Sequence, residues 1–380
     1  MGENAPASSS TEFPDSKSPS LYLTHPTPEE LLETWNFNSV NWGTALPLPD
    51  YLERERYLTT VPLAKDGGIT HWILVERGLP ANKRPILASC ESLRKPVLVA
   101  KDGVIRESIT HGVGSVFGQP KFRGKGYASR MLRELAPVLK TWQVEPTETV
   151  PFSILYSDIG TEYYSKLGWA TFPSTHFSFP PAASATAADV TPLTYPDLPA
   201  LCAKDEEYLR RGLEAAVKDG KTHVALIPNH DCMQWHHMRE DFVTSRIFGK
   251  TPTIKGAIIG ESGSRVWAIW TRAFYGPLNS KPGNTLHILR LVFENEEDTE
   301  ENAQKLKGIL SFAQSEAKEW QLSIVDVWNP SDTMKKLVKR TGIESEFVVR
   351  DKESIASLMW YEDGEAGDVN WFSNEKFGWC

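Results

Sequence analysis

A basic stretch with two closely spaced glycines, between a candidate strand and a candidate helix, has the composition of an anion-binding loop. Gly124 and Gly126 allow the backbone to approach a ligand closely and to adopt conformations closed to other residues. The free N–H groups of the next helical turn, at Tyr127 and Ala128, and the helix dipole favour an anion at the same place. The stretch therefore predicts a pyrophosphate site, and the basic side chains expected around it are Lys121, Arg123 and Lys125.

The spacing of the glycines excludes two common phosphate-binding motifs. A P-loop places four residues between its first glycine and a Gly-Lys pair that is followed by Ser or Thr. Here five residues separate Gly118 from Gly124, and Gly126 follows the lysine. A dinucleotide fingerprint counted from Gly124 needs its third glycine where Ser129 stands. The loop belongs to neither motif.

The loop resembles the acetyl-CoA loop of the Gcn5-related N-acetyltransferase (GNAT) superfamily, whose pattern is Gln/Arg-x-x-Gly-x-Gly/Ala after a β-strand. Lys121 stands at the position of the Gln or Arg. Small residues at alternate positions from Ser108 to Gly118 predict a strand with one bare face, unless a bulge interrupts the count. The resemblance implies acetyl-CoA as co-substrate, with its pantetheine arm along the end of this strand. The residues expected there are Val116, Phe117 and Gly118.

A second segment, residues 163–169, resembles the Phe-Tyr-x-x-Leu-Gly-Phe element of the same superfamily. The resemblance implies that Tyr164 protonates the departing CoA thiolate. A phenol with a pKa near 10 is protonated at neutral pH and acidic enough to give its proton to a thiolate. The alternative is a tyrosine pair on the core face of an ordinary helix.

The pattern of elements predicts an α/β (α+β) protein of the GNAT fold, with a mixed central sheet flanked by helices. The second half repeats the order strand, strand, long helix, strand, short helix, strand, and ends with strands at about 347–350 and 356–361. In place of the basic loop it carries an acidic run without glycine at residues 294–302. We therefore expect a disordered tail at residues 1–20, an acetyl-CoA-binding domain at 21–180 and a GNAT-like domain without a cofactor loop at 190–380.

Composition narrows the class of protein. Of the 380 residues, 40% are hydrophobic and 24% are charged, as in a globular protein with a sizeable core. The formal net charge of −8 disfavours nucleic acid as a partner and suits a cationic substrate. No apolar run approaches the length of a membrane span, and the four scattered cysteines favour a reducing, cytoplasmic compartment.

A narrower resemblance is to the fungal lysine N6-acetyltransferases of lysine degradation. It is carried by Arg54-Glu55, Cys90-Glu91-Ser92, His111-Gly112 and the segment Trp235–Glu240. The resemblance implies transfer of the acetyl group from acetyl-CoA to the ε-amine of free L-lysine by direct attack. It also implies a role for the last segment in shaping the acceptor pocket, where the candidate side chains are His236, Glu240 and Asp241.

The reaction needs a base, because the ε-amine of lysine has a pKa near 10.4 and arrives protonated. His111 titrates in a suitable range, although a lone histidine in a strand is more often a packing residue. Glu91 is an alternative base or an anchor for the ammonium group, unless it is a surface carboxylate. The aromatic C-terminus predicts an ordered tail, and the resemblance implies a third candidate, the carboxylate of Cys380, because some two-domain members of the superfamily place their terminal carboxylate in the active site. The alternative is a tail packed on the surface by its aromatic side chains. We expect no metal, since the adjacent His236 and His237 point about 100° apart on a helix.

Three other functions stay open on the sequence. One is acetylation of another small amine, such as a polyamine or an aminoglycoside-like compound. A second is acetylation of protein lysines, which needs an open groove. The third is a non-catalytic acyl-CoA sensor, against which the presence of Tyr164 argues.

Overall fold

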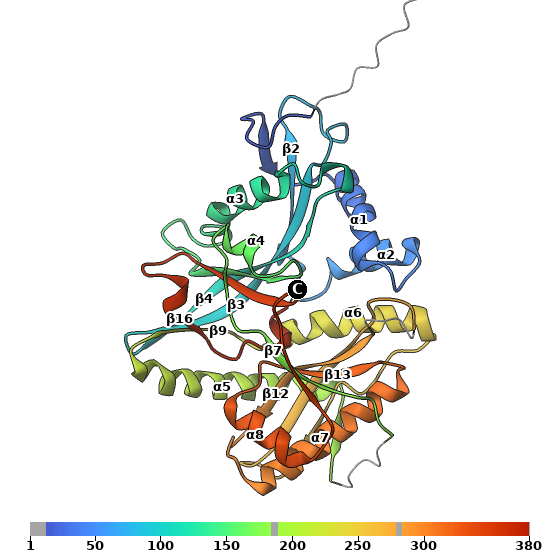
Figure 1. Ribbon diagram of the computed structural model, residues 1–380, viewed down its shortest axis with the longest axis vertical. Coiled ribbons are helices and arrows are strands. Elements are labelled where there is room, and N and C mark those ends of the chain that lie inside the picture. Colours follow the sequence, from blue (N-terminus) through green and yellow to red (C-terminus); the bar gives the residue numbers. More distant parts are fainter. Residues whose placement is uncertain (1–12, 184–188, 279–282, 380) are drawn as a thin grey trace, which may run out of the picture.

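The computed structural model of this chain describes residues 13–183, 189–278 and 283–379. These residues form two β-sheets, one above the other in Figure 1, with helices α5 (Leu198–Ala216) and α6 (His230–Phe248) between them. Apolar side chains of both helices pack in a single cluster with side chains from both sheets. None of the helices in the described ranges has the length and apolarity needed to cross a membrane.

The upper sheet, sheet A, is mixed. Within the described residues it has nine strands; seven follow the path β1–β2–β3–β4–β5–β15–β6, and β9 pairs with both β3 and β16. The pairs β4–β5 and β9–β16 are parallel and the other pairs of this sheet are antiparallel. The bounds are β1 (Leu21–Thr24), β2 (Ile69–Glu76), β3 (Ala88–Lys101), β4 (Val104–Phe117), β5 (Phe152–Ser157), β6 (Ala170–Thr171), β9 (Thr222–Leu226), β15 (Ile355–Trp360) and β16 (Val369–Trp371).

The lower sheet, sheet B, follows the path β14–β7–β13–β12–β11–β10–β8 within the described residues. Its single parallel pair there is β12–β13. Every residue of β12 is buried, as expected for a strand covered on both faces. The bounds are β7 (Thr175–Phe179), β8 (Thr191–Leu193), β10 (Gly256–Ile259), β11 (Val266–Ala273), β12 (Thr285–Phe293), β13 (Ile324–Trp328) and β14 (Glu346–Val349).

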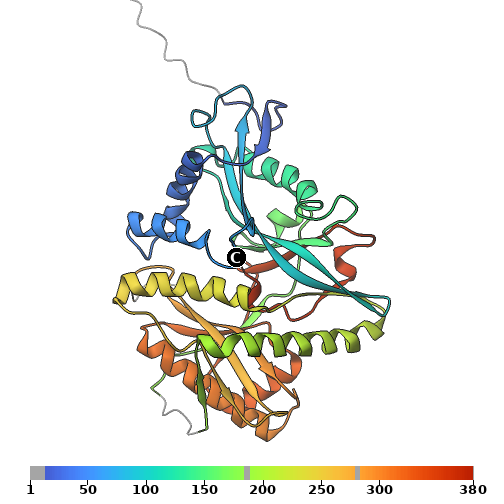
Figure 2. The ribbon, with the colours of Figure 1, turned by 180° about the vertical axis from the view of Figure 1, so that it is seen from behind.

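Four of the remaining helices, α3, α4, α7 and α8, cover the outer faces of the sheets, and α1 and α2 lie beside α6. In sheet A, α3 packs its apolar side against β2, β4 and β5, together with α4. In sheet B, α7 and α8 pack on the face turned away from α5 and α6. The pair α1 and α2 lies above α6 in both views (Figures 1 and 2). The bounds are α1 (Pro28–Trp42), α2 (Leu48–Leu58), α3 (Tyr127–Leu139), α4 (Glu162–Ser165), α7 (Glu300–Glu319) and α8 (Asp332–Thr341).

The two halves of the chain exchange strands. The strand β7 follows β6 of sheet A along the chain but pairs with β13 and β14 of sheet B. In return, β15 follows β14 of sheet B but lies between β5 and β6 of sheet A. The prediction that the strand at 356–361 completes the second sheet is therefore wrong. Both sheets contain strands from before and after residues 180–190. The sheets therefore do not test the predicted domain boundary there, which stays a prediction.

The tail expected at residues 1–20 is only partly within the described residues. Residues 1–12 lie outside them. The following segment differs from the prediction, because Phe13 packs edge-on against Phe122 with ring centroids 4.9 Å apart. The hydroxyl of Tyr127 donates to the carbonyl of Pro14 at 2.7 Å. An aromatic contact and a helix anchor this segment beside the basic loop.

Candidate active site

The parallel strands β4 and β5 pair over a short stretch and then separate. The pairing joins His111–Val113 to Ser153–Leu155, whereas β4 continues to Phe117. Ser115 has a φ of 51°, and the register between β3 and β4 shifts at the same place. This bulge interrupts the alternation that the sequence predicted and bends the end of β4. Residues 114–117 consequently have no pairing with β5, which leaves backbone groups available to a narrow ligand.

The basic loop connects the end of β4 to α3. Gly124 and Gly126 have φ angles of 76° and 85°, which residues with a Cβ rarely adopt. Gly126 is the N-cap of α3 and offers no side-chain acceptor to the first turn, so the N–H groups of that turn can bind an anion. A Cβ placed on Gly118 or Gly124 would meet no atom within 4 Å. The space beside the loop is therefore open.

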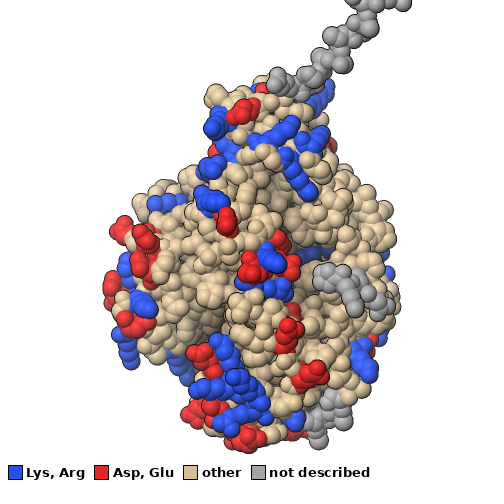
Figure 3. All heavy atoms as spheres, viewed as in Figure 1, with Lys and Arg blue, Asp and Glu red and all other residues tan. Residues whose placement is uncertain are grey.

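Positive side chains surround the loop. Lys121, Arg123 and Lys125 are exposed. In Figure 3, Lys and Arg gather over the upper part of the visible face, which carries β2 and α3. The separated strands, the open glycines and this charge fit the pantetheine and pyrophosphate of acetyl-CoA. A cavity of about 400 Å³ beside the loop is lined by Ser16, Lys17, Gly126, Ser129, Arg130 and Arg133.

Tyr164 lies on α4 with its ring in the apolar cluster between α3 and sheet A. It is 8% exposed and packs edge-on against Tyr163, with ring centroids 5.0 Å apart. The hydroxyl of Tyr163 accepts a hydrogen bond from Ser129 at 2.9 Å. Burial, with a smaller contribution from Tyr163, raises the pKa of Tyr164 above its ordinary value. The phenol is thus protonated at neutral pH, as a proton donor to a thiolate must be.

Glu91 lies on β3 beside the bulge of β4. Its Oε1 accepts a hydrogen bond from Ser115 Oγ at 2.8 Å, and its Oε2 is 3.6 Å from His71 Nε2. Burial first, and then the negative charge of Glu55, raise the pKa of Glu91 to about 7. A carboxyl group with this pKa can take up or release a proton at neutral pH.

The structure does not place His111 in an accessible position. Its side chain is fully buried, and its Nε2 is 3.0 Å from the carbonyl oxygen of Trp142, to which it donates. Burial lowers the pKa of His111 to about 4. The buried imidazole therefore acts as a packing residue, which was the alternative given for it, and we do not retain it as the base.

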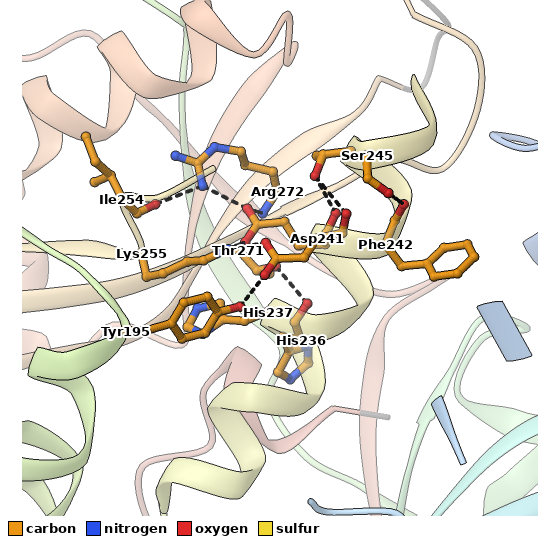
Figure 4. Close-up of polar contacts among 12 residues, drawn as sticks. Tyr195, His236, His237, Asp241, Phe242, Ser245, Ile254, Lys255, Thr271 and Arg272 are labelled. Atoms are coloured by element: carbon orange, nitrogen blue, oxygen red, sulfur yellow. Dashed lines mark hydrogen bonds and ion pairs between the residues drawn. The ribbon is translucent and has the colours of Figure 1, made fainter. Parts of the chain in front are cut away.

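The acidic candidates of α6 are occupied by partners inside the second half (Figure 4). Glu240 is 2% exposed and pairs with Lys255 at 2.7 Å and with Arg272 Nη1 at 2.8 Å. Asp241 pairs with Lys255 at 2.6 Å and accepts from Tyr195 Oη at 2.6 Å. These carboxylates hold α6 on sheet B, so we do not retain them as substrate ligands.

His236 and the buried Lys95 of β3 hold the C-terminal segment between the two sheets. His236 Nε2 donates to the carbonyl of Phe377 at 3.2 Å. Lys95 Nζ donates to the carbonyls of residues 378 and 379, both at 2.9 Å. Trp379 stacks on Tyr156 of β5 with ring centroids 4.2 Å apart. The proposed carboxylate base, on Cys380, lies outside the described residues.

Sequence reasoning assigned no role to several residues that surround Glu91. His71 is its neighbour on β2, and the charges of Arg54, Glu55 and Arg239 all act on its carboxyl group. The last three lie in segments that carried the family resemblance. The sequence could not predict that these residues lie near one another, because α2 and α6 are far apart along the chain.

Comparison with known proteins agrees with this geometry. Residues 176–380 match the family described as the LYC1 GNAT-like C-terminal domain. A lysine acetyltransferase of Yarrowia lipolytica is 27% identical over 285 residues, which cover 64% of this chain and 70% of the relative. Two solved structures are similar to this chain, and each match covers 89% of this chain and 72% of the chain in the solved structure. A conserved protein of Enterococcus faecalis V583 has a TM-score of 0.52 at 15% identity. A GCN5-related N-acetyltransferase of Anabaena variabilis has a TM-score of 0.51 at 13% identity. These two likenesses concern the fold alone, and they confirm the predicted GNAT fold.

Proposed function

We propose that this chain, which belongs to the family of GNAT proteins with a LYC1 GNAT-like C-terminal domain, acetylates the ε-amine of free L-lysine. As a member of that family it is an acetyl-CoA-dependent N-acetyltransferase. The observation that carries the proposal is the carboxyl group of Glu91, with a pKa of about 7, beside the open end of β4. The choice of lysine is supported by the name of the Yarrowia lipolytica relative. A role in lysine degradation and a cytoplasmic location belong to the same proposal.

We assign the binding of acetyl-CoA to the loop and the end of β4. The co-substrate supplies an acetyl group activated as a thioester. The backbone N–H groups of residues 124–128 would hold its pyrophosphate, with Lys121, Arg123 and Lys125 neutralising the charge. Residues 116–118 would contact the pantetheine arm.

Glu91 would receive the ε-ammonium group of lysine and take its proton. Ser115 donates to one oxygen of the carboxylate, which leaves the other oxygen, on the side of His71, for the substrate. Because the carboxyl group has a pKa of about 7, part of it is ionised at neutral pH and able to accept a proton. The deprotonated amine can then attack directly, without a covalent enzyme intermediate.

Tyr164 would give a proton to the departing thiolate. The test is Tyr164→Phe, which keeps the buried ring and removes the hydroxyl group. We expect kcat to fall by 10²-fold or more, while acetyl-CoA binding by calorimetry is retained. Loss of binding in step with kcat would instead give the ring a structural role.

The terminal carboxylate of Cys380 is the alternative base. Lys95 and His236 hold the segment that leads to it. One or two residues added after Cys380 would displace this carboxylate without altering Glu91. Unchanged turnover in the extended protein would remove the alternative, whereas loss of kcat at constant thermal stability would favour it.

The function itself is tested by the release of free CoA from acetyl-CoA. The acceptors are L-lysine, spermidine and a lysine-containing peptide, and the product is identified by mass spectrometry. We expect turnover with L-lysine. Turnover confined to spermidine or to the peptide would replace the proposed acceptor, and binding of acetyl-CoA without turnover on any amine would make the protein a sensor.

A further inference from the structure

Arg239 lies on the side of α6 that faces α2 and the C-terminal segment. One turn before it, His236 donates to the carbonyl of Phe377. One turn after it, Phe242 stacks on Tyr57 of α2, with ring centroids 5.7 Å apart. Residues three apart share a helix face. The side chain of Arg239 is therefore directed into the space between α2 and the C-terminal segment, where α6 lies below α2 (Figures 1 and 2).

Arg239 differs from the other buried cations near this space, because none of the residues that the structure describes pairs with it. Lys95 donates to two carbonyl groups, Lys255 pairs with two carboxylates of α6, and Arg54 pairs with Glu55 of α2. Arg239 is half-buried and makes neither a hydrogen bond nor an ion pair with any described residue. Withdrawing a guanidinium from water without a partner is unfavourable, so this site is suited to an anionic ligand.

The guanidinium of Arg239 and the carboxyl group of the candidate base, Glu91, interact through their charges. The charges of Arg239 and Arg54 oppose the rise in the pKa of Glu91, and the charge of Glu55 contributes to it. Arg54 donates to a single oxygen of Glu55, through Nε at 2.8 Å and Nη2 at 2.6 Å. The second oxygen of Glu55 is left for another cation.

We propose that Arg239 binds the α-carboxylate of the acceptor and that Glu55 receives its α-ammonium group, so that the site selects a free amino acid. The inference rests on the proposed acetylation of lysine and adds the basis of its selectivity. The four-carbon stem of lysine separates the reacting amine from both groups, so the proposal assigns the reacting amine to Glu91 and the head group to a separate site on α2 and α6. A polyamine has no carboxylate and would be repelled by Arg239, whereas a lysine inside a protein chain has no free α-carboxylate.

The test compares three acceptors that differ by one charged group. L-Lysine carries both head groups, cadaverine is lysine without the carboxylate, and 6-aminohexanoate is lysine without the α-amino group. For each, CoA release gives kcat and KM with the unaltered protein, Arg239→Gln and Arg239→Lys. Arg246→Gln is the matched control, because Arg246 lies on the same helix and pairs with Glu53 of α2 at 2.7 Å.

Loss of a charge-assisted bidentate contact should raise KM about 10- to 100-fold. We expect this change in Arg239→Gln for L-lysine and 6-aminohexanoate, with little change for cadaverine and partial rescue in Arg239→Lys. Arg246→Gln should leave all three acceptors unaffected. The unfolding temperature of Arg239→Gln should equal or exceed that of the unaltered protein, because no described residue loses a partner and an unpaired charge is removed from the interior.

The outcomes separate this inference from the proposed function. Equal losses for L-lysine and cadaverine in Arg239→Gln would overturn the carboxylate site and leave lysine acetylation standing. Turnover of cadaverine as efficient as that of L-lysine in the unaltered protein would overturn it too. Absence of both turnover and binding of L-lysine in the unaltered protein would overturn the proposed function, and the inference with it.

Discussion

Replacing Glu91 by Gln should make the protein more stable at alkaline pH and less active. In the folded chain, burial and the nearby Glu55 raise the pKa of Glu91 from 4.5 to about 7. Between these two values the folded state holds a proton that the unfolded chain has released, so this carboxyl group destabilises the fold increasingly as the pH rises. Gln has nearly the same shape and no charge, and its oxygen can still accept the hydrogen bond from Ser115.

The magnitude follows from the two pKa values. A change from 4.5 to about 7 corresponds to roughly 3 kcal/mol at about 1.4 kcal/mol per pH unit. Because Glu91 is 14% exposed, solvent weakens the effect, and we expect about 2 kcal/mol. The Gln variant should therefore gain about 2 kcal/mol in the free energy of unfolding at pH 8 and almost nothing at pH 4.5.

The assay is urea denaturation of both proteins at a series of pH values, with the difference in free energy of unfolding plotted against pH. All other titrating groups are common to the two proteins, so they largely cancel in this difference. Kinetics supply the second half of the prediction. The unaltered protein should show a rise in kcat with a pKa near 7, and Glu91→Gln should lose this rise and 10²- to 10⁴-fold in kcat.

Two results would refute this reasoning. A stability difference that does not change between pH 4.5 and pH 8 would show that Glu91 has an ordinary pKa in the folded protein. A Gln variant that keeps kcat within a few-fold of the unaltered protein would show that the base lies elsewhere. The terminal carboxylate of Cys380 would then be the remaining candidate.

Other substitutions test the basic loop and the packing of α6 on sheet B. Gly126→Ala places a Cβ 2.8 Å from Ser16 Oγ at a φ of 85°. We therefore expect the Kd for acetyl-CoA, measured by calorimetry, to rise at least tenfold, with kcat at saturation nearly unchanged. An unaltered Kd would contradict the binding of the pyrophosphate by this loop. Lys255→Met leaves the buried carboxylate of Glu240 with one cation fewer, and should cost about 3–5 kcal/mol of stability in urea denaturation. A cost below about 1 kcal/mol would show that the network in Figure 4 does not hold α6 in place.

Local features of the fold could be predicted from the sequence because they depend on neighbouring residues. The loop before α3 shows its glycines and lysines in a single run, and both glycines have the positive φ that this composition favours. The helix predicted at about 300–320 is observed as α7, with Thr299 as its N-cap. Hydrophobic periodicity and capping residues are properties of a short window, so they survive in the folded chain.

Pairings between distant segments could not be predicted in this way. The strand predicted at about 356–361 reads as the last strand of the second half, yet its partners are β5 and β6 of sheet A. Periodicity shows that a strand has a buried face but not which sheet buries it. For the same reason Glu240 resembled a substrate ligand, because its partner Lys255, just before β10, is recognisable only when that segment and α6 are packed together.

The exchange of strands and the placement of α6 are consistent with the part in the site that we propose for the second half of the chain. Without β15, the strand β5 would have an unpaired edge next to its open end, and β6 would lose its partner. Without α6 and the C-terminal segment, the space beside Glu91 would have neither Arg239 nor the residues that lead to Cys380. The second half has no glycine-rich loop of its own, and in the proposal made above it would complete the acceptor side of the first half's site. Selection of the amine would therefore depend on residues that are distant in sequence from the loop that binds the co-substrate.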